Sequence, residues 1–387
     1  MKDLSAKLII DGLKKLLGDK QQFLHEPSLG IDELNFVAKA IKKNSISTKG
    51  IFVPLFEKKL KEYTKTKHAI SIINGTQSIF IALKALGVKT NHEILVPALT
   101  FVGTVNAISY LGAEPHFIDS KLDDFGVNCQ KLEDYLSKIV KIKNNRCINI
   151  KTGRIIKAII PVHIFGHPCE IDKIVKIAKK YKLFVVEDAA EALGSFYKGK
   201  HLGTFGDVGC FSFNGNKIIT TGNGGAVITS NQKLIKKIKH LVTTAKIFHK
   251  WEYVHDDIGY NYRLSSINAA IGIAQIKRIQ KFLKAKRKLF SLYSNFFQKV
   301  NGVTLFKEKK YCKSNYWLQT IILNKEKTHL KNKILNYGFK KKIYLRPTWQ
   351  LISNLKPYKK KQKMNLSGSN EIYNRVINLP SSQSLIK

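Results

Sequence analysis

The chain has 387 residues, of which 44% are hydrophobic and 10% aromatic, which excludes a disordered protein and suits one large and one smaller domain. Its 67 Lys and Arg residues exceed the 27 Asp and Glu residues, giving a formal net charge of +40. Such an excess would suit a nucleic acid or an anionic membrane. However, the lysines are spread along the whole chain, and no apolar run approaches the ~18 residues of a membrane span. We therefore expect neither partner.

The N-terminal segment, residues 1–13, interrupts its apolar side chains with Lys2, Asp3, Lys7 and Asp11. This pattern predicts a short amphipathic helix rather than a signal peptide. We assign residues 1–25 to an N-terminal helical extension.

Between about Lys67 and Asn231, short β-rich runs alternate with segments of helical period. This alternation predicts an α/β fold with a largely parallel sheet between helices, whose ligands gather at the carboxyl ends of the strands. The expected helices include residues 76–86 and 170–181. The expected strands are residues 69–73, 93–96, 114–118, 158–162, 183–186, 208–212 and 226–229.

Two further patterns organise the rest of the chain. Residues 147–156 predict a β-hairpin with Gly153 in its turn. After about Gln280, a lysine-rich helix leads into a region with strand candidates at residues 303–306 and 316–323. We therefore expect a large domain over residues 26–285 and a smaller C-terminal α+β domain over residues 286–387.

The five cysteines are odd in number and widely spaced, without a Cys-x-x-Cys pair. This spacing argues against a disulfide framework and against a structural zinc site, so we expect no metal. It also favours a reducing, cytoplasmic setting. The cysteines are Cys129, Cys147, Cys169, Cys210 and Cys312.

Two residues that carry chemistry follow strands in the middle of the chain. Asp188 comes after the apolar run 183–186, and Lys217 lies in a loop after residues 208–212. Pyridoxal phosphate needs both groups: an amine that forms a Schiff base with its aldehyde, and an anion that keeps its pyridine nitrogen protonated. Asp188 could instead be a helix cap, and lysines are common here. The glycine-dense segments around Lys217 nevertheless give it a setting that a surface lysine does not need.

An anion site is indicated by the segment 74–78, which lies between a strand and a helix. Gly75 lets the backbone approach a ligand, Thr76 offers a hydroxyl, and the helix N-terminus presents free amide groups. A plain helix cap explains the segment equally well. Ser212 could add a phosphate hydroxyl, and Phe101, near a strand end, could either stack on a flat cofactor or lie in the core.

His163 and His167 are four residues apart, the spacing of two zinc ligands on a helix. They follow a strand, however, and Gly166 and Pro168 interrupt any helix. We therefore expect them to line a substrate pocket or to pack in a turn rather than to bind a metal.

The segment 259–263 supplies Tyr260, Asn261 and Arg263 just before a new helix. If this segment is only a turn before the helix, its residues need no function. If it is a binding site, it would suit a phosphate or a carboxylate, because the Arg263 guanidinium can hold two oxygens at once.

Together these residues resemble the DegT/DnrJ/StrS family of pyridoxal-phosphate-dependent sugar aminotransferases. The resemblance runs from about Glu26 to Ser382, and its most specific segments are residues 186–194 (VEDAAEALG), 203–206 (GTFG), 212–217 (SFNGNK) and 224–225 (GG). It implies the aspartate-aminotransferase architecture, fold type I.

The resemblance also implies roles for individual residues. Lys217 matches the Schiff-base lysine and proton shuttle, Asp188 the partner of the pyridine nitrogen, and Phe101 the stacking aromatic ring. Asn261 matches a residue that reaches the cofactor phosphate of the neighbouring subunit, which implies a homodimer with shared active sites. Many members have Gln or His at position 191; Glu191 here would repel the cofactor's phenolic oxygen unless one of the two is protonated. Gly75, Thr76 and Ser212 match the phosphate cradle.

Within the family, several segments resemble the branch that feeds legionaminic acid and related nonulosonic acids: residues 24–27 (LHEP), 148–154, 161–168 (PVHIFGHP), 214–217 (NGNK) and 243–251. This resemblance implies L-glutamate as amino donor and a nucleotide-linked 4-keto-6-deoxy-2-acetamido sugar as acceptor. Three alternatives stay open: a 3-keto sugar aminotransferase, a perosamine-type 4-keto sugar aminotransferase and, more remotely, a basic DNA-binding regulator. A sugar 3-dehydratase of the same family is disfavoured, because there a histidine replaces the lysine.

Overall fold

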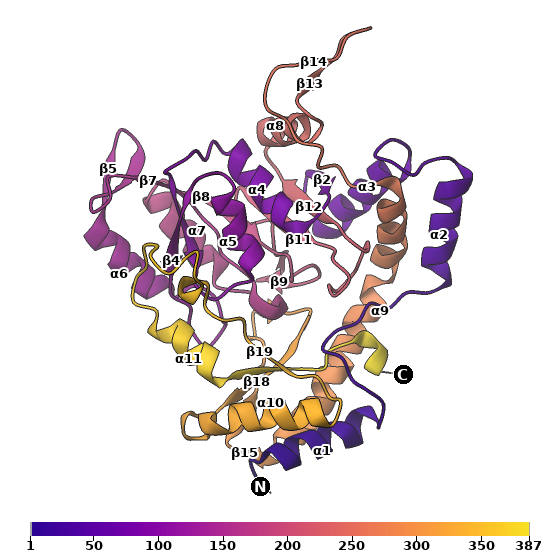
Figure 1. Ribbon diagram of the computed structural model, residues 1–387, viewed down its shortest axis with the longest axis vertical. Helices are drawn as coiled ribbons and strands as arrows, with labels where there is room; N and C mark the ends of the chain where they lie inside the picture. Colours follow the sequence, from indigo (N-terminus) through magenta and orange to yellow (C-terminus); the bar gives the residue numbers. More distant parts are fainter. Residues whose placement is uncertain (1, 387) are drawn as a thin grey trace.

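The computed structural model describes residues 2–386, which form a nine-stranded, mostly parallel sheet covered by helices and joined to a smaller α+β unit (Figure 1). From β11 through β8, β7 and β3 to β4 all pairs are parallel, whereas β12 runs antiparallel to both β11 and β2. The main path consists of β2 (His68–Ile72), β12 (Gly225–Thr229), β11 (Val208–Ser212), β8 (Phe184–Asp188), β7 (Ile155–Ile159), β3 (Glu93–Pro97) and β4 (Glu114–Ile118).

The covering helices form because each can bury an apolar face. In α7 (Ile171–Lys180), Ile171, Ile174 and Ile177 recur every third residue and are buried. The helix α4 (Gly75–Ala85) is apolar on most sides because it packs against β11, β12 and α5 (Val102–Ser109) at once. The other helices of this unit are α2 (Ile31–Lys42), α3 (Phe52–Thr64), α6 (Cys129–Ile139) and α8 (Gln232–Val242).

The long helix α9 (Ser266–Phe297) connects the two units. Ser265 caps its start by accepting the Asn268 N–H at 3.3 Å. Its first half buries residues such as Ile273 in the large core, and its last turns bury Tyr293 in a second core. The domain boundary that we propose at residues 285–286 therefore falls inside one continuous helix.

The second core belongs to the smaller unit and to the N-terminus together. Ile9, Ile10 and Leu13 of α1 (Ala6–Leu17) are fully buried there, and α1 packs on α10 (Lys331–Lys340). Figure 1 shows α1 and α10 side by side beneath the small sheet. That sheet has the order β16 (Val303–Leu305), β18 (Gln319–Leu323), β20 (Val376–Leu379) and β19 (Arg346–Pro347), with α11 (Ser367–Arg375) leading into β20.

Short strands complete the fold at its edges. The hairpin of β5 (Val140–Lys143) and β6 (Arg146–Asn149) extends the main sheet from β7. Three small pairings lie elsewhere: β1 (Lys2–Asp3) with β15 (Val300–Asn301), β9 (Phe196–Tyr197) with β10 (Lys200–His201) and β17 (Cys312–Lys313), and β13 (Lys246–Ile247) with β14 (Val254–His255).

All seven strands expected in the large domain are present, and the hairpin at residues 147–156 is confirmed, with Cys147 opposite Ile156 and Gly153 at φ +71°. The strand expected at residues 158–162 lies three residues earlier, at Ile155–Ile159, where its first residues pair with β6. The N-terminal helix begins at Ala6, after the Ser5 cap; Met1 lies outside the described residues. Among residues 2–386, no helix is long and apolar enough to cross a membrane.

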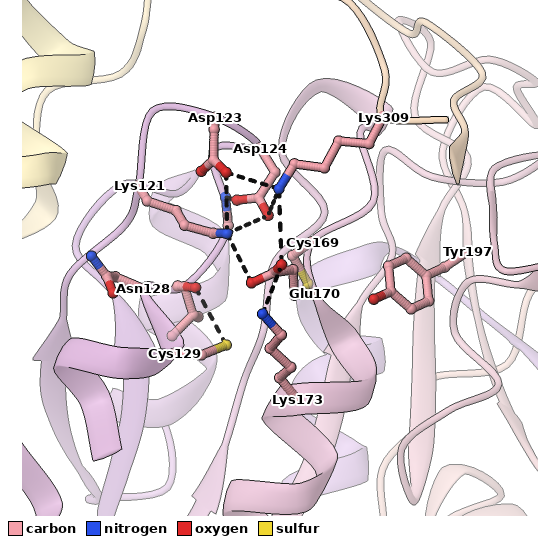
Figure 2. A network of polar contacts seen from close by, with 12 residues as sticks. Lys121, Asp123, Asp124, Asn128, Cys129, Cys169, Glu170, Lys173, Tyr197 and Lys309 are labelled. Atoms are coloured by element: carbon pink, nitrogen blue, oxygen red, sulfur yellow. Dashed lines mark hydrogen bonds and ion pairs between the residues drawn. The ribbon is translucent and has the colours of Figure 1, made fainter. Parts of the chain in front are cut away.

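A charged cluster ties the two units together, and we call it the Lys121–Lys309 cluster (Figure 2). Lys121 lies 2.8 Å from Glu170 and 3.2 Å from Asp124, which is buried. Lys309, from the smaller unit, lies 2.8 Å from Asp123 and 3.5 Å from Asp124. The segment after β4 is therefore held to the loop between β16 and β17.

Candidate active site

A cavity of about 280 Å³ opens at the carboxyl ends of β8 and β11, beside the N-terminus of α4. Parallel strands place the residues that follow them at this one edge of the sheet. Seven residues predicted from the sequence line it together: Gly75, Thr76, Phe101, Asp188, Glu191, Ser212 and Lys217.

One end of the cavity is built to receive an anion. Asn74 caps α4 by accepting the Gln77 N–H at 2.8 Å, and the first amide groups of a helix have no partner within the helix. A Cβ on Gly75 would lie 2.8 Å from the Ser212 Cβ, and one on Gly103 would lie 2.5 Å from the Thr76 hydroxyl oxygen. A side chain at either position would clash, so the two glycines let the segments that carry Ser212 and Thr76 approach closely at this helix start.

Asp188 ends β8 and is almost fully buried. Its Oδ2 accepts the Thr104 hydroxyl at 2.6 Å and its Oδ1 accepts the Ala190 N–H at 3.1 Å. Burial raises the pKa of the Asp188 carboxyl, and these two hydrogen bonds oppose that rise because they favour the ionised form. A carboxylate held in this way can keep a pyridinium nitrogen protonated.

Lys217 lies on a turn after β11, in which its N–H donates to the Asn214 carbonyl at 2.9 Å. Its amine nitrogen, Nζ, lies 3.2 Å from Glu191 Oε1 and 4.0 Å from the centroid of the Trp317 ring. The Trp317 indole is itself fixed, because its Nε1–H donates to the Asn216 carbonyl at 2.6 Å. The amine is thus held at the cavity wall between an acid and an aromatic face.

Glu191 is buried beside the amine. Its Oε2 accepts the Phe165 N–H at 2.8 Å, and the Asn315 side chain donates to its main-chain carbonyl at 2.8 Å. Burial and the Asp188 charge raise the pKa of the Glu191 carboxyl, while Lys217 and the Phe165 N–H oppose the rise. The site therefore contains two acids of different surroundings around one amine.

Phe101 stands at the open side of the cavity with 54% of its surface exposed, so it is not a core residue. Its ring meets the edge of Trp349, with centroids 6.4 Å apart. Trp317 and Thr104 also line the cavity, and the sequence reasoning missed both. Thr104 lies in the first turn of α5, just after Phe101, and its hydroxyl is 3.1 Å from that of Thr100, so its nearness in sequence to Phe101 is a local signal that could have found it. Trp317, by contrast, reaches Lys217 from 100 residues away.

The structure does not bring His163 or His167 to the cavity. The His163 Nε2 lies 3.1 Å from Glu187 Oε2, and Glu187 also accepts the backbone N–H groups of residues 203, 205 and 206. His167 is buried against Phe306 and Tyr316, and burial lowers its pKa to about 3. Both rings lie in packed interior, so their placement gives no support to a substrate-binding role.

Tyr260, Asn261 and Arg263 also lie outside the cavity of this chain. Arg263 pairs with Glu57 at 3.2 Å, Tyr260 stacks on Tyr262 with centroids 5.1 Å apart, and Asn261 is exposed. Their roles toward the substrate and toward a neighbouring subunit remain predictions.

A helix N-terminus, a buried carboxylate and a lysine lie around one cavity of this sheet, and the structural neighbours share the pyridoxal-phosphate fold type I architecture, so the fold is of this class. The family model for the DegT/DnrJ/EryC1/StrS aminotransferase family matches residues 27–387, and the chain belongs to this family. It is a pyridoxal-phosphate-dependent sugar aminotransferase, which decides against the DNA-binding alternative that its net charge allowed.

Similar proteins span nearly the whole chain. GDP-perosamine synthase from Escherichia coli O157:H7 is 38% identical over 94% of this chain and 93% of its own length. UDP-4-amino-4,6-dideoxy-N-acetyl-beta-L-altrosamine transaminase from Campylobacter jejuni is 34% identical over 91% of this chain and 90% of its own. Among solved structures, Helicobacter pylori PseC, an aminotransferase involved in the biosynthesis of pseudoaminic acid, is 26% identical, with a TM-score of 0.83 and coverage of 93% and 94%.

Proposed function

We propose that the protein transfers the amino group of L-glutamate to the 4-keto group of a nucleotide-linked 4-keto-6-deoxy-2-acetamido sugar. The product would be a 4-amino sugar for surface glycans or nonulosonic acids such as legionaminic acid. The observation that carries the amino-transfer chemistry is the placement of Lys217 and Asp188 around one cavity with a phosphate cradle. The sugar rests on the resemblance and on the Campylobacter relative, named for a UDP-linked 4-amino-4,6-dideoxy N-acetyl sugar.

Pyridoxal phosphate, when bound, supplies the aldehyde that carries the amino group and a ring that withdraws electrons from the carbon losing its proton. The Gly75 and Thr76 amides with Ser212 would hold its phosphate, and Asp188 would hold its ring nitrogen. Lys217 would bind the aldehyde and then, once displaced by the donor, move a proton at the reacting carbon.

The same groups serve both half-reactions. Lys217 would first take the proton from the α-carbon of glutamate; water would then break the carbon–nitrogen bond, so that 2-oxoglutarate leaves and its amino group stays behind. In the second half-reaction the sugar ketone would lose its oxygen as water when it takes up the amino group, and Lys217 would deliver a proton to the ketone carbon of the sugar. Because donor and acceptor use one cavity in turn, we expect ping-pong kinetics.

A second acceptor is favoured by one specific observation. The Escherichia coli relative, at 38% identity, is a GDP-perosamine synthase. A GDP-linked 4-keto-6-deoxy sugar without the acetamido group is therefore the alternative substrate, as the perosamine-type alternative already suggested.

Product analysis distinguishes the two acceptors. The purified enzyme is incubated with L-glutamate and either the UDP-linked acetamido sugar or the GDP-linked sugar, and 2-oxoglutarate and the amino sugar are followed by mass spectrometry. The proposal expects turnover of the UDP-linked sugar, with at least about a tenfold preference in kcat/KM. Preference for the GDP-linked sugar would replace it with the alternative, and Lys217→Ala controls for background.

We further propose a homodimer with shared active sites. The hairpin β13–β14 projects from the body (Figure 1), and Phe248, Trp251 and Tyr253 on it are 94%, 76% and 81% exposed. Exposed aromatic side chains on a two-stranded hairpin suit an interface, and Asn261 near its base is exposed, as a contact with a second copy requires. Light scattering should give a dimer that Trp251→Lys weakens and Phe339→Lys, at an exposed ring on α10, does not; a monomeric wild type would contradict the proposal.

The cytoplasm is the compartment that we propose. All five cysteines are free and buried, which suits a reducing environment. Fractionation of cells that express the protein would test this location.

A further inference from the structure

The amine of Lys217 contacts an acid and an aromatic ring. Glu191 Oε1 lies 3.2 Å from its Nζ, and the Trp317 ring faces it at 4.0 Å, an arrangement that attracts cations. The amine must nevertheless be neutral before it can attack an aldehyde. A proton therefore has to leave Nζ inside the cavity.

Glu191 is the group placed to receive that proton. Its Oε1 is within hydrogen-bond distance of Nζ, and its Oε2 is already anchored by the Phe165 N–H. The Asn315 side-chain amide also donates to the main-chain carbonyl of Glu191 at 2.8 Å. The carboxyl group therefore cannot swing away from the amine without losing the Phe165 hydrogen bond.

The two acids of the cavity are not equivalent. Asp188 accepts two hydrogen bonds, from Thr104 and Ala190, which stabilise its charge. Glu191 accepts one backbone hydrogen bond and otherwise depends on the Lys217 charge, while Asp188 repels it. When Lys217 becomes neutral, the negative charge of Glu191 is therefore no longer stabilised by an ammonium group, whereas that of Asp188 keeps its two hydrogen bonds.

We propose that Glu191 is the base that takes the proton from the Lys217 ammonium group and then stays in the cavity as a neutral carboxylic acid. One N–H bond breaks and one O–H bond forms, so the pair passes from opposite charges to two neutral groups. The neutral acid can donate a hydrogen bond to the phenolic oxygen of the cofactor, which removes the repulsion that a glutamate at this position would otherwise cause. This inference rests on the proposed function and adds a proton-transfer step to it.

The test follows cofactor capture rather than turnover. Pyridoxal phosphate is mixed with apoenzyme from about pH 6 to about pH 9, and the visible band of the lysine-bound cofactor is timed by stopped flow. Glu191→Gln keeps an acceptor for the Phe165 N–H but cannot take a proton. Its capture rate should fall about tenfold or more near neutral pH and approach the wild-type rate as the pH rises and hydroxide deprotonates the lysine. The matched control is Glu133→Gln, at a glutamate that pairs with Lys180 on the surface.

Each result has a distinct meaning. Capture by Glu191→Gln at the wild-type rate at every pH would overturn the inference. Absence of the band in the wild type would instead overturn the assignment of Lys217 as the cofactor-binding lysine. If Glu191→Gln does not fold, the wild-type infrared difference spectrum, holoenzyme minus apoenzyme, should show a new band of a neutral carboxyl group, and its absence would contradict the proposal.

Discussion

Lysines and carboxylates meet at two places in this chain, and the two places differ in how their charges are matched. In the Lys121–Lys309 cluster, each carboxylate contacts at least one lysine and both named lysines contact several carboxylates (Figure 2). In the cavity, the single amine of Lys217 contacts Glu191, and Asp188 has no lysine in contact among the described residues. The ion pairs of the cluster hold segments of the fold together, whereas the cavity has fewer lysines than carboxylates, and its groups are available to a ligand.

The protonation of the acids follows their burial as well as their lysine contacts: in the Lys121–Lys309 cluster, burial raises the pKa of the buried Asp124, as it does for the cavity acids, whereas the more exposed members behave differently. Burial opposes ionisation of Glu170 and Asp123, but the nearby Lys121 and Lys309 outweigh it and lower the pKa of both carboxyl groups. In the cavity, burial prevails and raises the pKa of both Asp188 and Glu191. The difference between the cavity and the Lys121–Lys309 cluster can therefore be tested by making the same kind of substitution in each.

Loss of the cavity lysine should have the largest effect. Lys217→Ala removes the amine that binds the cofactor and moves the proton, so we expect kcat for amino transfer to fall by about 10⁴-fold or more. Lys309→Ala should change kcat less than about twofold, because Lys309 lies in the structural cluster. Steady-state release of 2-oxoglutarate measures both, and substantial turnover by Lys217→Ala would contradict the assignment.

The next effect concerns the buried cavity acid. Asp188→Asn keeps the shape but removes the charge that would hold a ring proton, so we expect kcat to fall about 10²- to 10³-fold. The same change at Asp123, which is exposed in the other cluster, should leave kcat near the wild-type value. Equal losses at the two positions would indicate that Asp188 acts on folding rather than on chemistry.

A stability effect should appear in the other cluster. Lys121→Ala leaves the buried Asp124 with Lys309 as its remaining ion-pair partner, and we expect the free energy of unfolding to fall by about 2 kcal/mol. Urea unfolding measures the change. Lys173→Ala is the matched control, since Lys173 touches only the outer side of Glu170 at 3.1 Å, and should cost less than about 1 kcal/mol.

The smallest effects should have opposite signs at two glutamates. The folded-state pKa of Glu170 is lowered, so its charge stabilises the fold above its unfolded pKa of about 4.3, and this stability is lost as the pH falls through the folded pKa. The folded-state pKa of Glu191 is raised, so its contribution decreases as the pH rises from about 4.3 through the folded pKa.

At neutral pH we therefore expect Glu170→Gln to destabilise the apoenzyme and Glu191→Gln to leave it unchanged or stabilise it, each by about 1 kcal/mol. Urea unfolding at about pH 7 and about pH 4 measures both variants. The difference in the free energy of unfolding between Glu170→Gln and the wild type should be smaller at about pH 4 than at about pH 7. Destabilisation by both variants to the same extent would show that the two clusters are not distinct.

Much of the fold was predictable because its signals are local. Strands such as β11 have apolar runs bounded by turn residues, and helices such as α7 repeat their apolar residues at helical spacing. The strand β5 was not expected as a separate element, since it is a short and largely exposed edge strand. The helix expected after residues 259–263 is confirmed, and it continues without a break into the lysine-rich helix as α9, with Ser265 as its cap.

The candidate site was predictable where its residues follow strands along the sheet edge. Asp188, Ser212 and Lys217 come from such positions, and so does the cradle at Gly75. Trp317 was not predictable, since it reaches the lysine from the smaller unit. The placement of His163 was not predictable either, because its partner Glu187 lies 24 residues away in the sequence, on β8.

The most direct test of the account is the visible absorbance spectrum of the purified protein supplied with pyridoxal phosphate, before and after L-glutamate is added. The account predicts a band of lysine-bound cofactor that gives way to a band at shorter wavelength when glutamate donates its amino group. A protein that shows no such band, although pyridoxal phosphate is present, would contradict the roles assigned to Lys217 and Asp188.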